Sequence, residues 1–286
     1  MNKLIINADD LGSDKARNDG IFEAIQSGIV TSASILPNGP GLSDVLKRIQ
    51  SGAFKNISWG VHLNLSEGAP VSTGNIHFLC PHGIFLGKVL SQRLLMQEGD
   101  PDLEDEITRE IDAQITLFET LGIPLSHLDG HQHVHIFPAV LRAMIEAAQK
   151  HHIPWIRMPN EPEPIYLDST LPSPLAEEGR RFRDLGSHAR SILLASGLHM
   201  TDHFRGLYLK GHLSIQALES MLRVLPDGLT ELMVHPGRIA KNPQETPFSS
   251  FSTFDREQEL ETLLNSKLRL ILKERKIILT PFPEPP

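Results

Sequence analysis

The chain of 286 residues has a single cysteine, Cys80. An intramolecular disulfide is therefore impossible, which fits a protein of the reducing cytosol. The first apolar run, within MNKLIINADD, is too short for a signal peptide, and acidic residues follow it directly. We therefore expect a cytoplasmic protein.

Long basic segments and long apolar segments are also lacking. The formal net charge is −8, and no basic run indicates a nucleic-acid partner or an anionic membrane surface. No apolar stretch approaches the ~20 residues of a membrane-spanning helix. The first strand-like segment is followed by NADDLG rather than G-x-G-x-x-G, so dinucleotide binding lacks its usual motif. We expect no nucleic-acid partner and no membrane span.

What the sequence does have is a regular alternation of short apolar segments with helix-length segments. Alternation of this kind predicts a parallel sheet with right-handed crossovers. We predict a single domain over residues 1–286, an α/β fold of the irregular (β/α) TIM-like barrel type, with an open doubly wound sheet as the alternative. Long loops are expected near 66–87, 159–174 and 238–251, and a final long helix over 256–276. The eight predicted strands are residues 4–10, 29–36, 57–65, 125–128, 155–158, 203–209, 229–234 and 277–280.

Five of these segments end in a residue that can bind a metal or transfer a proton. In parallel α/β folds the carboxyl ends of the strands meet on one face, where ligands bind. Carboxylates, histidines and an arginine gathered there indicate metal-assisted hydrolysis. The residues concerned are Asp9, Asp10, His62, His131, Arg157 and His235.

The adjacent acids Asp9 and Asp10 follow a buried apolar strand, where unpartnered carboxylates are costly. One could bind a cation while the other accepts a proton from water. The alternative is that one of them, or Ser13, caps the following helix. For His62, in GVHLN, a metal-ligand role competes with that of a buried, hydrogen-bonded core histidine. Strand alternation places Asn64 on the same face as His62.

The segment DGHQHVH contains three alternate histidines, His131, His133 and His135. In an extended conformation they would lie on one side, and neutral imidazoles suit Zn²⁺ and related cations. Not all three need be ligands, because His133 could line the substrate pocket and His135 could be structural. Asp129 could orient a ligand imidazole.

For two further strand-end residues the sequence allows more than one role. Arg157 could orient a carboxylate, bind substrate or form a structural ion pair. His235, in MVHPG, could be the general acid that protonates a leaving amine, or a structural histidine before a turn.

The motifs NADDLG, GVHLNL, LDGHQHVHIFP, IRMPNEP and ELMVHPGR occur in this order over essentially the whole chain. Together they resemble the YdjC-like carbohydrate deacetylases, which include chitooligosaccharide deacetylases and relatives associated with hopanoid biosynthesis. The segments DHFRGLYLKG and KERKIILT look especially like the hopanoid-associated branch.

This resemblance implies an irregular barrel, a bound divalent cation and hydrolysis of an N-acetyl group. By position, Asp10, His62 and His131 match the metal ligands, and Asp9 matches the catalytic base. His235 resembles the proton-donating histidine of the wider polysaccharide deacetylase group. That wider group often uses two ligand histidines four residues apart, as His131 and His135 are, but the closer family takes its second histidine from the GVHL segment.

We therefore expect a metal-dependent hydrolase that removes an N-acetyl group from an amino sugar in an oligosaccharide or glycolipid and releases acetate. The cation could be Mg²⁺ or Zn²⁺, and a homodimer is a family-level expectation. Arg157, Asn64 and His133 are expected to hold the substrate or order the site. The alternatives are a metal-dependent phosphoesterase, a glycosidase with two carboxylates, and a non-catalytic sugar-binding protein on the same fold.

Overall fold

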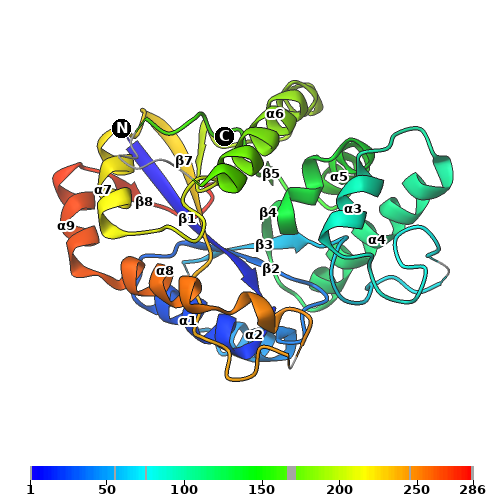
Figure 1. Ribbon diagram of the computed structural model, residues 1–286, viewed down its shortest axis with the longest axis horizontal. Coiled ribbons are helices and arrows are strands. Elements are labelled where there is room, and N and C mark those ends of the chain that lie inside the picture. The colour runs from blue at the N-terminus through cyan, green and yellow to red at the C-terminus, as the bar shows by residue number, and fades with distance from the viewer. Residues whose placement is uncertain (1, 55, 75, 166–171, 245, 285–286) are drawn as a thin grey trace.

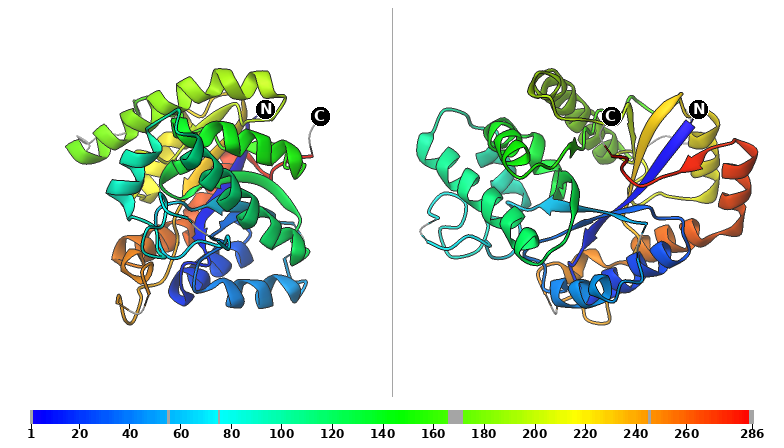
Figure 2. Two further views of the ribbon diagram at one scale, coloured as in Figure 1. Left: turned by 90° about the vertical axis from the view of Figure 1, so that its right-hand side faces the viewer. Right: turned by 180° about the vertical axis from the view of Figure 1, so that it is seen from behind.

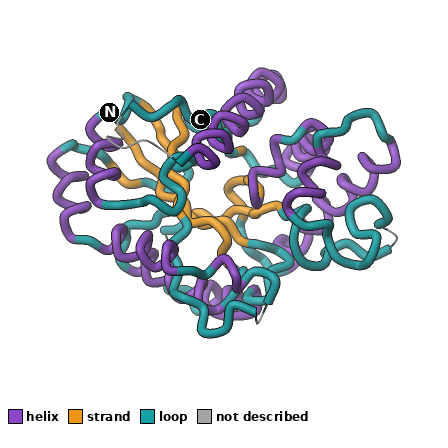
Figure 3. Tube along the Cα trace, in the orientation of Figure 1, coloured by secondary structure: helices purple, strands orange, loops and turns teal. Residues whose placement is uncertain are grey.

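The computed structural model describes residues 2–54, 56–74, 76–165, 172–244 and 246–284. Its strands are parallel and form one curled sheet, with helices around the outside (Figures 1 and 3). The predicted α/β fold of irregular barrel type is thereby confirmed. The strands are β1 Asn2–Leu11, β2 Ser32–Ile35, β3 Ser58–Leu63, β4 Leu125–Gly130, β5 Trp155–Ile156, β6 His203–Arg205, β7 Gly228–Val234 and β8 Ile278–Leu279.

The sheet order is β5-β4-β3-β2-β1-β7-β6, and β8 pairs with the start of β1. Figure 2 shows the sheet and the helices around it from two further sides. Between β5 and β6 the described residues form no strand ladder, and only an isolated bridge joins Trp155 to His199. The barrel is therefore incomplete on this side.

The helices occupy the connections between the strands, as the right-handed crossover rule requires. None of those in the described ranges is long and apolar enough to cross a membrane. The α-helices are α1 Lys15–Gln26, α2 Leu42–Gln50, α3 Lys88–Leu95, α4 Pro101–Thr120, α5 Pro138–Lys150, α6 Ser173–Ser196, α7 Ile215–Arg223, α8 Phe254–Leu264 and α9 Ser266–Glu274, and the 3₁₀ turns are η1 His131–Ile136 and η2 Ser249–Phe251.

Residue alternation along β1 divides the core into two parts. Leu4, Ile6 and Ala8 belong to the large apolar cluster that includes the helices. Ile5 belongs to a separate small cluster with Trp155 and Phe282. Successive strand residues point to opposite faces, so Ile5 and the polar residues at positions 7 and 9 face the barrel interior. The interior is thus apolar at the amino ends of the strands and polar at their carboxyl ends.

In the segment 66–87, predicted to be a loop, the described residues lie in neither helix nor strand. Its backbone is held by two buried glutamates on one face of α4. Glu110 accepts hydrogen bonds from the backbone N–H groups of Val71 and Ser72, both at 2.9 Å. Glu106 accepts from three successive N–H groups, those of residues 77–79. One face of α4 therefore fixes the path of the loop that follows β3.

The prediction of one continuous helix over 256–276 is wrong. The segment forms two helices, α8 and α9, separated at Asn265, which has extended backbone angles and accepts a hydrogen bond from the N–H of Lys267. Asparagine is among the strongest N-cap residues, so it starts a new helix here. The predicted loop 159–174 ends where α6 begins at Ser173, and its residues 166–171 lie outside the described ranges.

Candidate metal centre and its pocket

The carboxyl end of β1 directs two adjacent carboxylates into one site. The register against β2 shifts between Ala8 and Leu11, and Asp10 has a φ of 65°, in the left-handed region. This irregularity removes the strict alternation that would point Asp9 and Asp10 to opposite faces. Neither caps α1, because that role belongs to Asp14, whose side chain accepts from the N–H of Arg17.

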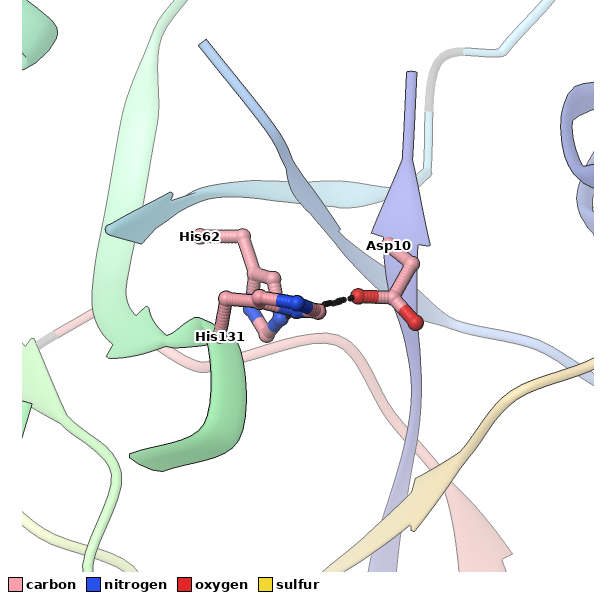
Figure 4. Close-up of side chains that lie close together, drawn as sticks. All are labelled: Asp10, His62 and His131. Atoms are coloured by element: carbon pink, nitrogen blue, oxygen red, sulfur yellow. Dashed lines mark hydrogen bonds and ion pairs between the residues drawn. The ribbon is translucent and has the colours of Figure 1, made fainter. Parts of the chain in front are cut away.

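Asp10, His62 and His131 come together from β1, β3 and the turn after β4 (Figure 4). Asp10 Oδ1 lies 2.9 Å from His131 Nδ1 and 3.3 Å from His62 Nε2. All three residues are buried. Burial alone would raise the pKa of Asp10, but its contacts with the two imidazoles and with Arg17 hold it well below the usual value. The group therefore offers an ionised carboxylate and two imidazoles at one point.

These separations fit a coordinated divalent cation. Ligand atoms about 2.0–2.1 Å from an ion lie about 3.3 Å apart at tetrahedral angles and about 2.9 Å apart at right angles. The two contacts of Asp10 fall at these values. A carboxylate with two imidazoles is also a usual donor set for such cations. The residues present therefore fit a metal ion.

A carboxylate behind His62 fixes the orientation of that imidazole. His62 Nδ1 lies 2.7 Å from Asp129 Oδ1, which leaves Nε2 directed at Asp10. Carboxylate–histidine pairs of this kind orient metal ligands and raise their basicity. Burial opposes a charge on His62, but Asp129 and Asp10 outweigh it and raise its pKa to about 10.

Asp9, His62 and Asp129 also bring three ligand atoms close together. The guanidinium of Arg157 lies 2.6 Å from Asp9 and 2.7 Å from Asp129, however, and would repel a cation there. The group of Asp10, His62 and His131 is therefore the better metal centre.

Asp9 is anchored separately from the Asp10, His62 and His131 group. Arg157 donates two hydrogen bonds to its two oxygens, and Asn7 donates a third at 2.8 Å. Burial raises the pKa of Asp9, and Arg157 offsets this only in part. A carboxylate with a raised pKa in a fixed orientation is a suitable proton acceptor.

The three alternate histidines do not form the extended run that their spacing suggested. The segment turns in η1, where Gln132 and His133 both have positive φ values of 54° and 56°. His131 is thereby directed to Asp10 and His133 to the pocket, while His135 Nε2 lies 3.0 Å from the carbonyl oxygen of Arg157. Strained backbone of this type clusters at functional sites.

His235 follows β7 and faces Asp9, with its Nε2 atom 4.0 Å from Asp9 Oδ2. Its backbone N–H donates to Glu259 at 2.6 Å. Burial, together with the charge of Arg256, lowers the pKa of His235 well below the usual value, so the imidazole rests neutral. Its Nδ1 has no hydrogen-bond partner among the described residues.

A pocket of about 320 Å³ opens over these groups. Six of the eight residues proposed from the sequence line it: Asp9, Asp10, His62, His131, His133 and His235. The other two, Arg157 and Asn64, are fully buried and outside the lining. Arg157 contacts three carboxylates, which favours its carboxylate-orienting role over a substrate contact. Asn64 bonds the loop backbone at residues 66 and 67.

Sequence patterns did not indicate the rest of the pocket wall. Apart from Gly130 of β4 and Met233 of β7, these residues come from helices and loops, where no strand-end rule applies. They include Arg17 of α1, Glu178 and Phe182 of α6, and a group near the last helices. The lining residues not foreseen are Arg17, Lys88, Gly130, Gln132, Glu178, Phe182, Lys210, Met233, Ser250, Phe251, Thr253 and Arg256.

A family model described as YdjC-like protein matches residues 3–274. The chain belongs to the YdjC-like family. The resemblance inferred from its five motifs is thereby confirmed. The residues of the metal centre and Asp9 all lie within the matched range.

Relatives named as deacetylases match over most of their length. A human protein named carbohydrate deacetylase is 34% identical over 288 residues, covering 95% of this chain and 87% of that protein. A chitooligosaccharide deacetylase of Proteus mirabilis is 32% identical over 279 residues, covering 95% and 94%. The crystal structure of an Enterococcus faecalis protein named for cellobiose-phosphate cleavage shares the fold, with a TM-score of 0.74 at 24% identity over 99% of this chain and 98% of that one.

Proposed function

We propose that this protein is a carbohydrate deacetylase, a hydrolase that uses a divalent cation to cleave the N-acetyl amide of an amino sugar and release acetate. The observation that carries the proposal is the meeting, in one pocket, of the Asp10, His62 and His131 centre with the separately anchored Asp9. The names of the YdjC-like relatives support the same reaction.

Asp10, His62 and His131 would hold the cation, with Asp129 orienting His62. When bound there, a divalent cation such as Zn²⁺ or Mg²⁺ polarises the acetyl carbonyl and lowers the pKa of a coordinated water. The pocket is open enough to admit a sugar, while the centre itself is buried, which strengthens electrostatic effects.

Asp9 acts as the general base. Its carboxylate takes a proton from the water that attacks the acetyl carbon. The two hydrogen bonds from Arg157 fix the plane of the carboxylate, so its orientation is set before substrate binds. Arg157 is thus a positioning residue. Asn64 has a related role, because it organises the loop that follows β3.

His235 protonates the departing amine. Since the imidazole is neutral at rest, the proton it donates has to be supplied during the reaction. Asp9, 4.0 Å from Nε2, is placed to pass on the proton that it takes from water. His133 lines the same pocket and contacts the substrate.

The test is acetate release from N-acetylglucosamine, N,N′-diacetylchitobiose, longer chitooligosaccharides and a glycolipid that carries N-acetylglucosamine. Each substrate is assayed as purified, after chelation, and after restoring Mg²⁺, Zn²⁺, Mn²⁺ or Co²⁺. Chelator-sensitive acetate release, recovered with one of these ions, is the expected result. Phosphate release from phosphorylated sugars without any acetate, or reducing ends released despite chelation, would refute the deacetylase proposal.

A further inference from the structure

Three charged residues from distant segments meet on the wall of the pocket. Lys88 is the first residue of α3, Glu178 lies in α6, and Lys210 lies in the turn after β6. Glu178 Oε1 is 2.8 Å from Lys88 Nζ, and Glu178 Oε2 is 2.5 Å from Lys210 Nζ. All three line the same pocket as Asp9 and Asp10.

The cluster is a partly exposed ion-pair group rather than part of the core. The side chains of Lys88, Glu178 and Lys210 are 46%, 25% and 33% exposed. Burial would raise the pKa of Glu178, but Lys210 and Lys88 lower it to about 2, so the carboxylate is ionised. Lys88 also stands at the amino end of α3, where a positive charge is unfavourable against the helix dipole. A residue that is unfavourable for its local structure, as Lys88 is at this helix end, is expected at functional sites.

The cluster shares one pocket with the proposed reacting groups, since Lys88, Glu178 and Lys210 line it together with Asp9 and His235. The partly exposed ring of Phe251 lines the same pocket and offers an apolar face. A ligand that fills this pocket therefore has these side chains in its wall.

The chemistry of the cluster suits a neutral, hydroxyl-rich ligand. Each lysine offers N–H donors, and the glutamate between them offers acceptor oxygens. A hydroxyl group both donates and accepts, so it matches such a mixed set. An anionic group would gain from the lysines but would meet Glu178 between them.

We propose that Glu178, Lys88 and Lys210 bind the ring hydroxyl groups of the sugar and so determine which amino sugars the pocket accepts. The favoured substrate class is an uncharged glycan unit that bears the acetamido group, rather than a phosphorylated sugar. This inference rests on the proposed deacetylase function.

The test compares Glu178→Gln and Lys210→Met with the unmodified protein, using N,N′-diacetylchitobiose and acetate release. Hydrogen bonds from charged groups are strong, so KM should rise about 10- to 100-fold in each variant. The value of kcat should stay within about threefold, because these contacts hold the ground state and the transition state alike. Metal content should be unchanged.

The matched control is Glu146→Gln, which removes a carboxylate from the exposed ion pair with Arg142 on α5, outside the pocket. Its KM should equal that of the unmodified protein. If KM stays within about twofold in both cluster variants, or rises equally in the control, the proposal is overturned.

A binding measurement separates this inference from the deacetylase proposal. Calorimetric titration of the same disaccharide into the Asp9→Asn protein, with and without Glu178→Gln, needs no turnover. Weaker binding with Glu178→Gln supports the cluster even if no acetate is ever released. If Glu178→Gln instead binds N-acetylglucosamine 6-phosphate more tightly and the neutral disaccharide no less tightly, the cluster is an anion site and the inference fails.

Discussion

Asp9 and Arg157, 148 positions apart in the chain, are joined by two parallel hydrogen bonds, from Nη1 to Oδ2 at 2.6 Å and from Nη2 to Oδ1 at 2.7 Å. The same guanidinium contacts Asp129 on β4 and Glu231 on β7. One side chain therefore links β1, β4 and β7 across the interior of a barrel that is open between β5 and β6. The proposed base and the integrity of the barrel depend on the same residue.

Replacing Asp9 by asparagine should abolish turnover and leave the metal in place. The amide keeps the shape of the side chain but cannot accept the water proton, so kcat should fall by about 10²–10⁴-fold. Elemental analysis should show the metal content of the unmodified protein. Asp19→Asn, which removes an exposed carboxylate on α1, is the control. A near-normal kcat in Asp9→Asn would show that another group is the base.

Arg157→Lys should impair both folding and catalysis. Lysine keeps the charge but cannot make the paired contact with Asp9 or reach three carboxylates at once. We expect the free energy of unfolding in urea to fall by about 3 kcal/mol and kcat to fall by about 100-fold through misplacement of the base. Arg142→Lys, at an exposed ion pair, should change neither quantity. Normal stability in Arg157→Lys would contradict the structural role assigned to the guanidinium.

Metal affinity should depend on His62 directly and on Asp129 through it. His62→Ala should lose the metal after dialysis, whereas Asp129→Asn should bind it about 10- to 100-fold more weakly. Calorimetric titration with Zn²⁺ measures both, and His212→Ala, at an exposed histidine, is the control. Unchanged metal content in His62→Ala would move the ligand role to His133 or His135.

Glu231 should give the stability a distinct pH dependence. Burial raises its pKa from 4.5 to about 7, with Arg157 offsetting only part of the effect. Between these values the folded protein keeps a proton that the unfolded chain has lost, so the free energy of unfolding falls as pH rises and levels off above about 7. Glu231→Gln lacks the titrating group. Over the same pH range, its free energy of unfolding should therefore fall by about 3 kcal/mol less than that of the unmodified protein.

The measurement is urea unfolding of both proteins at several pH values between 4.5 and 8. Glu146→Gln, which removes an exposed carboxyl group, should keep the slope of the unmodified protein. Parallel curves for Glu231→Gln and the unmodified protein would mean that Glu231 titrates normally in the fold.

The strand-end rule explains how much of the site the sequence could predict. Asp10 and His62 lie at the carboxyl ends of β1 and β3, and His131 directly follows β4. Parallel strands bring such positions together whatever lies between them. The rule could not foresee the left-handed turn at Gln132 and His133, because it depends on tertiary contacts around the segment. The histidines would share one side only in an extended conformation, and the chain in fact turns there.

Residues beyond the strand ends followed no such rule. Lys88 and Glu178 are separated by 90 positions and meet only because α3 and α6 both border the pocket. Arg157 was correctly placed at a strand end, but its contact with Glu231 depends on the curl of the sheet. The prediction of one helix over 256–276 did not consider Asn265, which caps α9 and divides the segment into two helices.

The two α4 glutamates that hold the loop 66–87 bind its main chain rather than its side chains. Main-chain N–H groups are present at every residue except proline, so most substitutions in this loop leave its anchors in place. The loop can therefore change its side chains while keeping its shape. Sequence variation in this segment leaves the course of the chain after β3 unchanged.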